Sequence, residues 1–192
     1  MSVLGKNDRI YARKCNIKQV NASDTNAFLL KNRIQGWCQS KINYGLYSDD
    51  VLVALMTFGK PRFNKKAEYE LLRYAIAMNT NVIGGASKLL SHFKKVHIPN
   101  SIISYCDLRW NTGALYEQLG FIKTSISEPN CWYTYRHKTF ESRMRYQKHK
   151  LSTILKVFDP SKTEWQNMQL NSYDRFWDCG NAVFMWVKTN GG

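Results

Sequence analysis

A glycine-rich turn before an amphipathic segment is a candidate site for binding a phosphate group. The stretch NVIGGASKLLSHFKK, Asn81 to Lys95, puts two glycines and an alanine ahead of a predicted helix. The first N–H groups of a helix lack partners within it, and their dipoles favour an anion. Gly84 and Ala86 leave the approach open, while Ser87 and Lys88 add a hydroxyl and a positive charge. The alternative is a tight strand-to-helix turn that binds nothing.

Two acidic side chains and one arginine on predicted strands are candidates for proton transfer or anion binding. Glu70 alternates with Leu72 and Tyr74, so these three share one face of an extended strand. A buried carboxylate suits a general base, and the alternative is an ion pair with Arg73 or a basic loop residue. Arg73 falls on the opposite face and could clamp a carboxylate or phosphate, or form a structural pair. Asp107 ends an apolar strand, where it could act in catalysis, cap the next helix or form a turn.

Cysteines and histidines do not suggest a metal centre. The five cysteines contain no C-x-x-C pair, and the four histidines are not spaced as ligands on one element. Reduced, buried thiols are expected, and a metal requirement stays open. Cys106, inside an apolar strand, would need a nearby base to act as a nucleophile.

Positive charge points to a polyanionic partner. The chain has 28 Lys and Arg against 14 Asp and Glu, a net charge of +14. DNA is the expected partner, and a role in solubility alone is the alternative. No apolar run is long enough for a membrane span, and the first residues do not read as a signal peptide, so a cytoplasmic protein is expected.

Basic residues in two segments are the expected DNA contacts. They are Lys60, Arg62, Lys65, Lys66, Arg136, Arg143, Arg145, Lys148 and Lys150. Four aromatic residues lie among basic ones and could stack on bases: Trp110, Trp132, Tyr133 and Tyr135. The alternative is a solvated basic face with the aromatics in the core.

The elements that must position these residues predict an α/β domain with a mostly antiparallel sheet and crossover helices. Strands are predicted over 15–20, 68–77, 101–106, 121–126 and 131–136, a hairpin over 44–59, a turn over 81–85, and helices over 23–31, 86–95 and 112–119. Residues 1–135 are expected to form this domain. Residues 136–192 are expected to form a basic C-terminal extension that ends in a hairpin around a Cys-Gly-Asn turn.

Two motifs resemble those of the GNAT N-acetyltransferase superfamily. Its loop motif, Q/R-x-x-G-x-G/A, is matched at Asn81, Gly84 and Ala86, with Asn81 departing from Gln or Arg. Its later motif, N-x-x-A-x-x-x-Y-x-x-x-G-F, is approximated by Asn111, Ala114, Tyr116, Gly120 and Phe121. The resemblance covers roughly residues 15–135 and implies a GNAT fold. It also implies that acyl-CoA (acetyl-CoA) binds at Asn81, Ile83, Gly84, Gly85, Ala86, Ser87 and Lys88.

Tyr116 takes its role from the same resemblance. In acetyltransferases the matching tyrosine is the general acid toward the departing thiolate, and a phenol with an ordinary pKa near 10 can supply that proton. The alternative is an aromatic side chain that packs a helix on the sheet.

A phage branch of the superfamily gives a closer resemblance. Segments similar to YGLYSDDVLVALMTFGKPR, EYELLRY, SIISYCDLRWNTGALYEQLGF and DRFWDCG occur fused to phage homing endonucleases. Mom-type DNA modification enzymes are similar more loosely, at Glu70, Leu71, Arg73, Ser104, Tyr105, Asp107 and Tyr116. These relatives often carry His where this chain has Arg33, so any chemistry of that His is in doubt here.

The resemblance implies a phage-encoded transferase that adds an acyl or glycyl-type group to a base amine in DNA, with adenine as the expected base. Two alternatives stay open. One is an acetyl-CoA-dependent enzyme acting on a protein or small amine, and the other is a DNA-binding module without catalysis. The Mom-type similarity also leaves open whether CoA is the donor.

Overall fold

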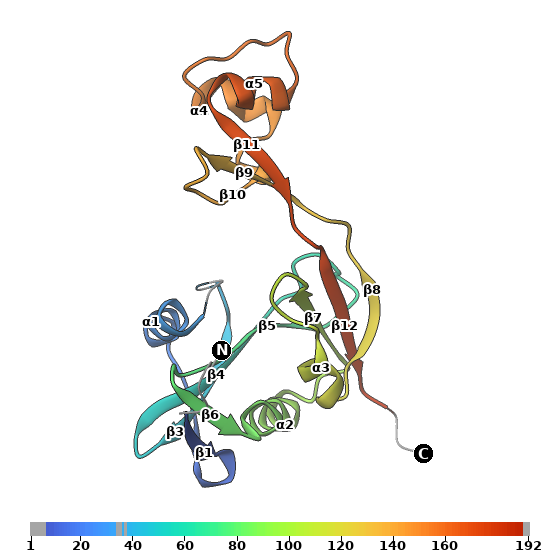
Figure 1. Ribbon diagram of the computed structural model, residues 1–192. Coiled ribbons are helices and arrows are strands. Elements are labelled where there is room, and N and C mark those ends of the chain that lie inside the picture. The colour runs from blue at the N-terminus through green and yellow to red at the C-terminus, as the bar shows by residue number, and fades with distance from the viewer. Residues whose placement is uncertain (1–6, 34–35, 37, 190–192) are drawn as a thin grey trace. The chain divides into compact units, whose positions relative to one another are not determined.

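The computed structural model describes residues 7–33, 36 and 38–189. The chain divides into two compact units (Figure 1). The first comprises Met1–Tyr105, Gly113–Ser125 and Val183–Gly192, and the second Cys106–Thr112 and Ile126–Ala182. No helix in the described ranges is long and apolar enough to cross a bilayer.

A seven-stranded mixed sheet confirms the predicted fold class. Its strands, in spatial order, are β2 (Asn16–Gln19), β3 (Ile42–Ser48), β4 (Val51–Gly59), β5 (Tyr69–Ile76), β7 (Ser101–Asp107), β12 (Asn181–Val187) and β8 (Ile122–Ile126). Neighbours from β2 to β5 run antiparallel, and β5 runs parallel to β7. The predicted hairpin is β3–β4, with Asp49 and Asp50 at φ 48° and 61°, the left-handed values that a two-residue hairpin turn needs.

Three helices belong to the first unit: α1 (Ala22–Asn32), α2 (Gly85–His97) and α3 (Ala114–Gln118). The N-cap of α1 is Asn21, whose side chain accepts from the Asp24 N–H. Along α2, the apolar stripe is buried, and Phe93 stacks on Phe58 of β4 with ring centroids 3.6 Å apart.

A parallel strand pair replaces part of the turn predicted over 81–85. β6 (Thr80–Ile83) pairs with β1 (Asp8–Tyr11), and the 3-10 helix η1 (Ala12–Lys14) follows β1. Val82 is buried between exposed Asn81 and Ile83, a period-two pattern that suits a strand.

The second unit has its own small sheet and core. Strands β9 (Cys131–Tyr135), β10 (Glu141–Ser142) and β11 (Tyr173–Trp177) lie in the order β10-β9-β11. Its helices are η2 (Arg143–Arg145), η3 (Lys148–Lys150), α4 (Leu151–Ile154) and α5 (Glu164–Leu170). Tyr133, Tyr146, Leu151 and Met168 form its buried core.

The expected C-terminal extension with a terminal hairpin is wrong. β12 returns to the seven-stranded sheet between β7 and β8, whereas β11 pairs with β9. Most of the second unit is therefore an insertion between two neighbouring strands. Gly180, at φ +73°, approaches the other arm of the insertion so closely that a Cβ would lie 2.2 Å from the Ser127 carbonyl oxygen.

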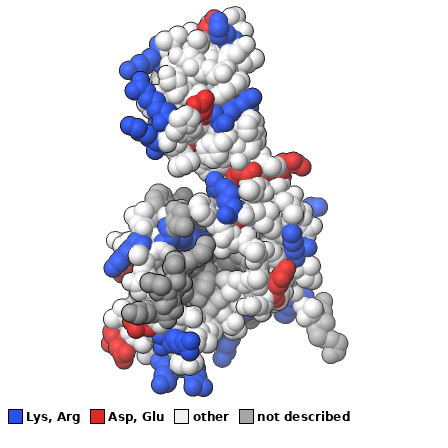
Figure 2. Space-filling model, viewed as in Figure 1, with Lys and Arg blue, Asp and Glu red and all other residues white. Residues whose placement is uncertain are grey.

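Positive charge is spread over both units. The second unit has ten Lys and Arg against seven Asp and Glu, and the first has eighteen against seven. Figure 2 shows basic side chains on both. Most of the net charge of +14 therefore belongs to the first unit.

Candidate active site

An opening between β5 and β7 is the most distinctive feature of the large sheet. Their backbone pairing covers only Tyr69 with Ile102 and Glu70 with Ile103, at the start of both strands. One residue further on, the buried Ser104 Oγ donates to the Leu71 carbonyl at 2.8 Å in place of a ladder bond. Parallel strands paired only at their beginnings separate toward their carboxyl ends.

Tyr116 lies at this opening, because its Oη is 3.0 Å from Ser104 Oγ. A serine hydroxyl has one proton, and a carbonyl can only accept. That proton is within donor distance of both the Leu71 carbonyl and Tyr116 Oη, so Ser104 holds the Tyr116 hydroxyl beside the backbone of β5.

The ring of Tyr116 is held by two buried phenylalanines. It stacks on Phe184 of β12, with centroids 4.9 Å apart and an interplanar angle of 19°, and meets Phe121 edge-on at 5.8 Å. Gly113 precedes α3 at φ +91°, and a Cβ there would lie 2.4 Å from the Phe184 ring. Both observations explain why glycine begins this helix. Tyr116 thus has the packing role considered as its alternative, together with a hydroxyl held beside Ser104.

Glu70 is fully engaged by one arginine. Its carboxylate is 1% exposed and accepts from Arg62 Nη2 at 2.6 Å, Arg62 Nε at 3.0 Å and the Arg62 backbone N–H at 2.8 Å. This is the ion pair with a basic loop residue that the sequence left open. Arg62, expected as a DNA contact, has its guanidinium committed to Glu70.

The basic loop that contains Arg62 is anchored to β7. Phe63 meets Tyr105 edge-on, with the ring centroids 5.6 Å apart. Burial and the Glu70 charge raise the pKa of Tyr105, so its phenol stays neutral. Lys60, Lys65 and Lys66 of the same loop are exposed.

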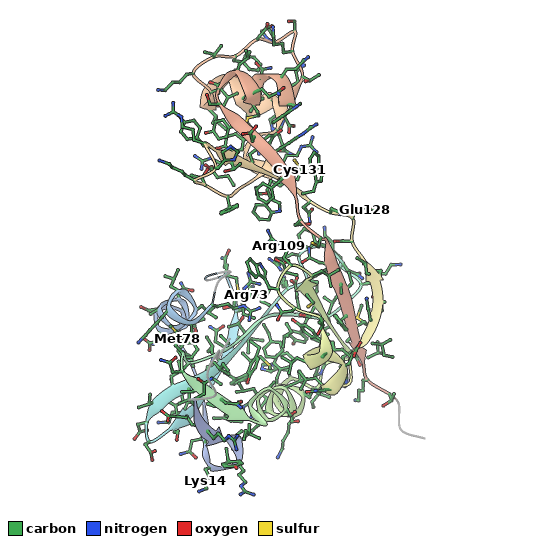
Figure 3. The ribbon with its side chains drawn as sticks, in the orientation of Figure 1. Lys14, Arg73, Met78, Arg109, Glu128 and Cys131 are labelled. Atoms are coloured by element: carbon green, nitrogen blue, oxygen red, sulfur yellow. The ribbon has the colours of Figure 1, made fainter. Side chains whose placement is uncertain are left out.

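Arg73, labelled in Figure 3, is half-buried on β5. A register shift pairs Thr57 with Arg73 and Phe58 with Leu71, which leaves Leu72 as the extra residue of a β-bulge. Arg73 Nη1 donates to the Leu72 carbonyl at 2.8 Å. Among the described residues, its buried Nε has no hydrogen-bond partner, a condition that calls for an explanation such as an absent ligand.

Asp107 belongs to the second unit and is bound by Arg109. The distance from Arg109 Nη2 to Oδ2 is 2.7 Å, and the Arg109 backbone N–H donates to Oδ1 at 3.0 Å. The bond to this carboxylate raises the pKa of Arg109. Asp107 therefore forms a turn, one of its expected alternatives, and a role in catalysis stays a prediction.

The predicted phosphate cradle begins at Gly84, the N-cap of α2, with φ +75°. The first turn holds no acidic residue, and Gly84 and Ser87 are exposed. A Cβ at Gly85 would lie 2.8 Å from the Tyr74 hydroxyl, and burial raises the pKa of Tyr74 to about 12.

Lys88 also has partners within the chain. Its Nζ donates to the carbonyls of Ala12 at 2.8 Å and Cys15 at 2.6 Å. Asn81 and Ile83 lie on β6, one strand before the cradle, where they pair with Arg9 and Tyr11 of β1.

The basic residues predicted for the second unit are mostly exposed, but several have partners. Arg143 binds Glu164 and Arg145 binds Glu141, each at 2.7 Å, and Lys150 Nζ donates to the Met144 carbonyl. Arg136 and Lys148 are exposed. Of the aromatic residues expected to stack on bases, Tyr133 is 1% exposed and belongs to the core. Its hydroxyl donates to Glu164.

The sequence analysis did not single out Phe184, or the role of Ser104 in positioning the Tyr116 hydroxyl. The serine was visible only as part of a motif. Phe184 gave no signal, because the whole insertion separates it from Tyr116 along the chain. Arg33, in place of the relatives' histidine, donates through Nη1 to the Tyr74 carbonyl.

Known structures share this architecture at low sequence identity. A Bacillus subtilis acetyltransferase in complex with CoA matches with a TM-score of 0.52 and 12% identity, over 92% of this chain and 100% of that one. The ribosomal-protein-S18-alanine N-acetyltransferase from Escherichia coli matches at 0.54 and 11%, over 93% and 96%. An N-acetyltransferase from Staphylococcus aureus matches at 0.52 and 13%, over 90% and 98%. No family model matches the chain, and no curated protein matches it. The chain therefore has the GNAT acetyltransferase fold.

Proposed function

We propose that the protein is a transferase that moves an acyl or glycyl-type group to a base amine in DNA, with adenine as the expected base. The observation that carries the transferase part is Tyr116 Oη, held 3.0 Å from Ser104 Oγ where β5 and β7 separate. A phenol held in position where two strands separate is suited to donate a proton to a leaving group.

Acyl-CoA is the proposed donor, and the residues before α2 fit its diphosphate. Exposed Gly84 and Ser87, a left-handed N-cap and a first turn without acidic residues all favour an anion. Since the Lys88 ammonium has partners in the chain, the proposed contacts narrow to the backbone of Gly84, Gly85, Ala86 and Ser87 and the Ser87 hydroxyl. When bound, acyl-CoA supplies a thioester carbonyl that an amine can attack.

Proton transfer is divided among this chain's own side chains. Tyr116 carries the proton for the leaving sulfur on Oη, and Ser104 holds that hydroxyl in position. Glu70 or Asp107 is the proposed acceptor of the amine's proton. Both are bound by arginines, so their variants need a stability measurement beside the kinetic one.

Charge supports DNA as the acceptor. The exposed loop lysines Lys60, Lys65 and Lys66 can neutralise phosphates. Arg73 has a buried Nε without a hydrogen-bond partner in the described part of the chain, which suits a phosphate oxygen of the substrate. A base amine of duplex DNA is hidden in the stack, so the base must be flipped out.

An acetyltransferase acting on a protein amine is the second candidate. The Escherichia coli structure, named for an alanine of a ribosomal protein, favours it. In that case salt should barely affect activity, whereas a DNA substrate makes it steeply salt-dependent.

The deciding experiment is nucleoside mass spectrometry on DNA from cells that express the wild type or Tyr116→Phe. A new nucleoside mass that is absent with the variant supports the proposal and identifies the transferred group. Unchanged nucleosides with both proteins would overturn DNA modification and favour the protein acetyltransferase or a DNA-binding module without catalysis.

A further inference from the structure

The second unit contains a pocket that the transferase proposal does not use. It lies where β9 and β11 meet η2 and the start of α5, and its volume is about 460 Å³. Its walls include Tyr133, Arg143, Glu164, Trp165, Arg175 and Trp177. Ligand pockets have volumes of about 300 to 1,000 Å³. Cys131, on the β9 side of this pocket, is labelled in Figure 3.

A guanidinium between two indoles dominates this pocket. The Arg175 guanidinium carbon lies 4.5 Å from the Trp165 ring centroid and 4.9 Å from that of Trp177. Trp165 packs against the core, with its ring 6.2 Å from that of Tyr133. Trp177 is 54% exposed, so it presents a large aromatic surface to solvent.

The one carboxylate of the pocket is already neutralised. Glu164 accepts from Arg143 Nε at 2.7 Å and from the Tyr133 hydroxyl at 2.8 Å. Burial acts to raise the pKa of Glu164, but these bonds outweigh it and the pKa is lowered, so the carboxylate stays charged and paired. Among the described residues, Arg175 makes no ion pair with a carboxylate, which leaves the pocket with a net positive charge.

We infer that this pocket binds an unpaired nucleotide of a nucleic acid strand. The base stacks on the exposed indole of Trp177, and the phosphate binds Arg175, with Arg143 beside it. Arginine can stack on an aromatic ring and bind a phosphate at the same time, and aromatic stacking is tolerant of base identity. An acidic peptide offers the charge without a flat ring for Trp177, so the stacking surface favours a nucleotide.

The pocket lining includes none of the proposed acyl-transfer residues, and its test needs no acyl donor. The full-length protein is titrated into a fluorescently labelled twelve-nucleotide oligothymidylate at low salt, and anisotropy gives the Kd. Trp177→Ala is expected to raise the Kd about tenfold. Arg175→Lys keeps the charge but loses the planar stack, and a several-fold rise is expected.

Two controls separate this site from general effects. Phe140→Ala removes an aromatic side chain of the same unit that is 75% exposed and outside the pocket lining, and its Kd should stay within about twofold of wild type. Tyr116→Phe should bind the oligonucleotide as tightly as the wild type does. The binding test therefore remains informative even if the transferase proposal fails. Because Trp177 is half-exposed and outside the buried core, its replacement is expected to leave the unit folded, as circular dichroism would check.

The inference is overturned if Trp177→Ala and Arg175→Lys both bind the oligonucleotide as tightly as the wild type does. It is also overturned if base-free polyphosphate competes equally well and its binding is weakened to the same extent by Trp177→Ala, because stacking would then contribute nothing.

Discussion

The hydroxyl of Ser104 links the backbone of β5 to the phenol of Tyr116, and alanine at this position would remove both bonds. We expect Ser104→Ala to lower kcat about tenfold, because the Tyr116 hydroxyl loses the side chain that holds it in position. The KM for the donor should stay unchanged, since the diphosphate site is on another element. Steady-state kinetics would show this, and an unchanged kcat would exclude the orienting role.

For Glu70, the expected effect of a substitution is on the stability of the protein. Glu70→Gln removes a buried charge that accepts three bonds from Arg62, and we expect a loss of about 2 kcal/mol in the free energy of unfolding. Urea unfolding of Glu70→Gln, Arg62→Gln and the double variant would give the coupling between the two side chains. If the protein loses activity at unchanged stability, Glu70 acts in the chemistry instead.

The sequence predicted some features of individual residues and missed others, and the difference has physical reasons. The pattern of residues 68–77 predicted the strand that carries Glu70, but the partner of Glu70 depends on how the loop before β5 folds back, and periodicity carries no information about that. The β-bulge at Leu72 likewise gives no sequence signal, because its extra residue is an ordinary strand former. Tyr116 was found through a motif, and the ring that supports it was not.

Among the elements, α3 depends on the glycine that begins it. We expect Gly113→Ala to lower kcat, because a Cβ would lie 2.4 Å from the Phe184 ring on which Tyr116 stacks, and φ +91° disfavours alanine. The strain should also lower stability by about 1 to 2 kcal/mol. Ala114→Gly is the matched control, since it changes an exposed neighbour in the same helix. Equal activity of Gly113→Ala and wild type would contradict the packing argument.

The stability of the segments at the start and end of the insertion depends on the ionised carboxylate of Asp178. Its carboxylate accepts from the Asn130 N–H at 2.8 Å, Trp132 Nε1 at 2.9 Å and the Gly180 N–H at 2.8 Å. Burial acts to raise the pKa of Asp178, but these bonds outweigh it and the pKa is lowered. Their contribution is therefore complete above the unfolded pKa near 3.9 and is lost as the pH falls through the lower folded value.

Thermal unfolding at pH 6 and pH 3 would test this dependence. Wild type should lose more stability between these pH values than Asp178→Asn, which lacks the titrating group. The variant should be less stable by about 1 to 2 kcal/mol at pH 6. The same loss in both proteins would mean that other carboxylates determine the acid sensitivity.

Most elements of the first unit follow from periodicity and turn residues. The β3–β4 hairpin, β5, α2 and β7 were predicted close to their bounds. β1 and β6 were not predicted, because each is short and is stabilised by pairing with the other, which lies far away along the chain. A hairpin was predicted for β11 and β12 since both are apolar and a glycine lies between them, yet their partners belong to different sheets.

At the scale of the whole molecule, the arms of the insertion meet. The Ser127 N–H donates to the Asn181 carbonyl at 2.8 Å, and the Asn181 N–H to Ser127 Oγ at 2.9 Å. We expect that a short Gly-Asn turn can replace residues 128–180 and join β8 to β12. The remaining protein should bind duplex DNA with steep salt dependence, because the first unit holds most of the positive charge.

Binding of the shortened protein to the oligothymidylate, by contrast, should be lost with the pocket. Comparing its Kd for duplex and single strand over a salt series would check both parts. Loss of duplex binding would assign the main DNA contacts to the insertion.

The position of β12 between β7 and β8 also has a consequence for synthesis. β12 is translated after every other strand of the large sheet, although it occupies an inner place in it. Until residues 181–187 leave the ribosome, β7 and β8 lack their common neighbour and expose unpaired edges. Meanwhile the insertion, which has its own core, can already fold. Sheet closure is thus a late folding event that also delivers Phe184 to Tyr116, so a nascent chain acquires its phenol support only when the last strand is in place.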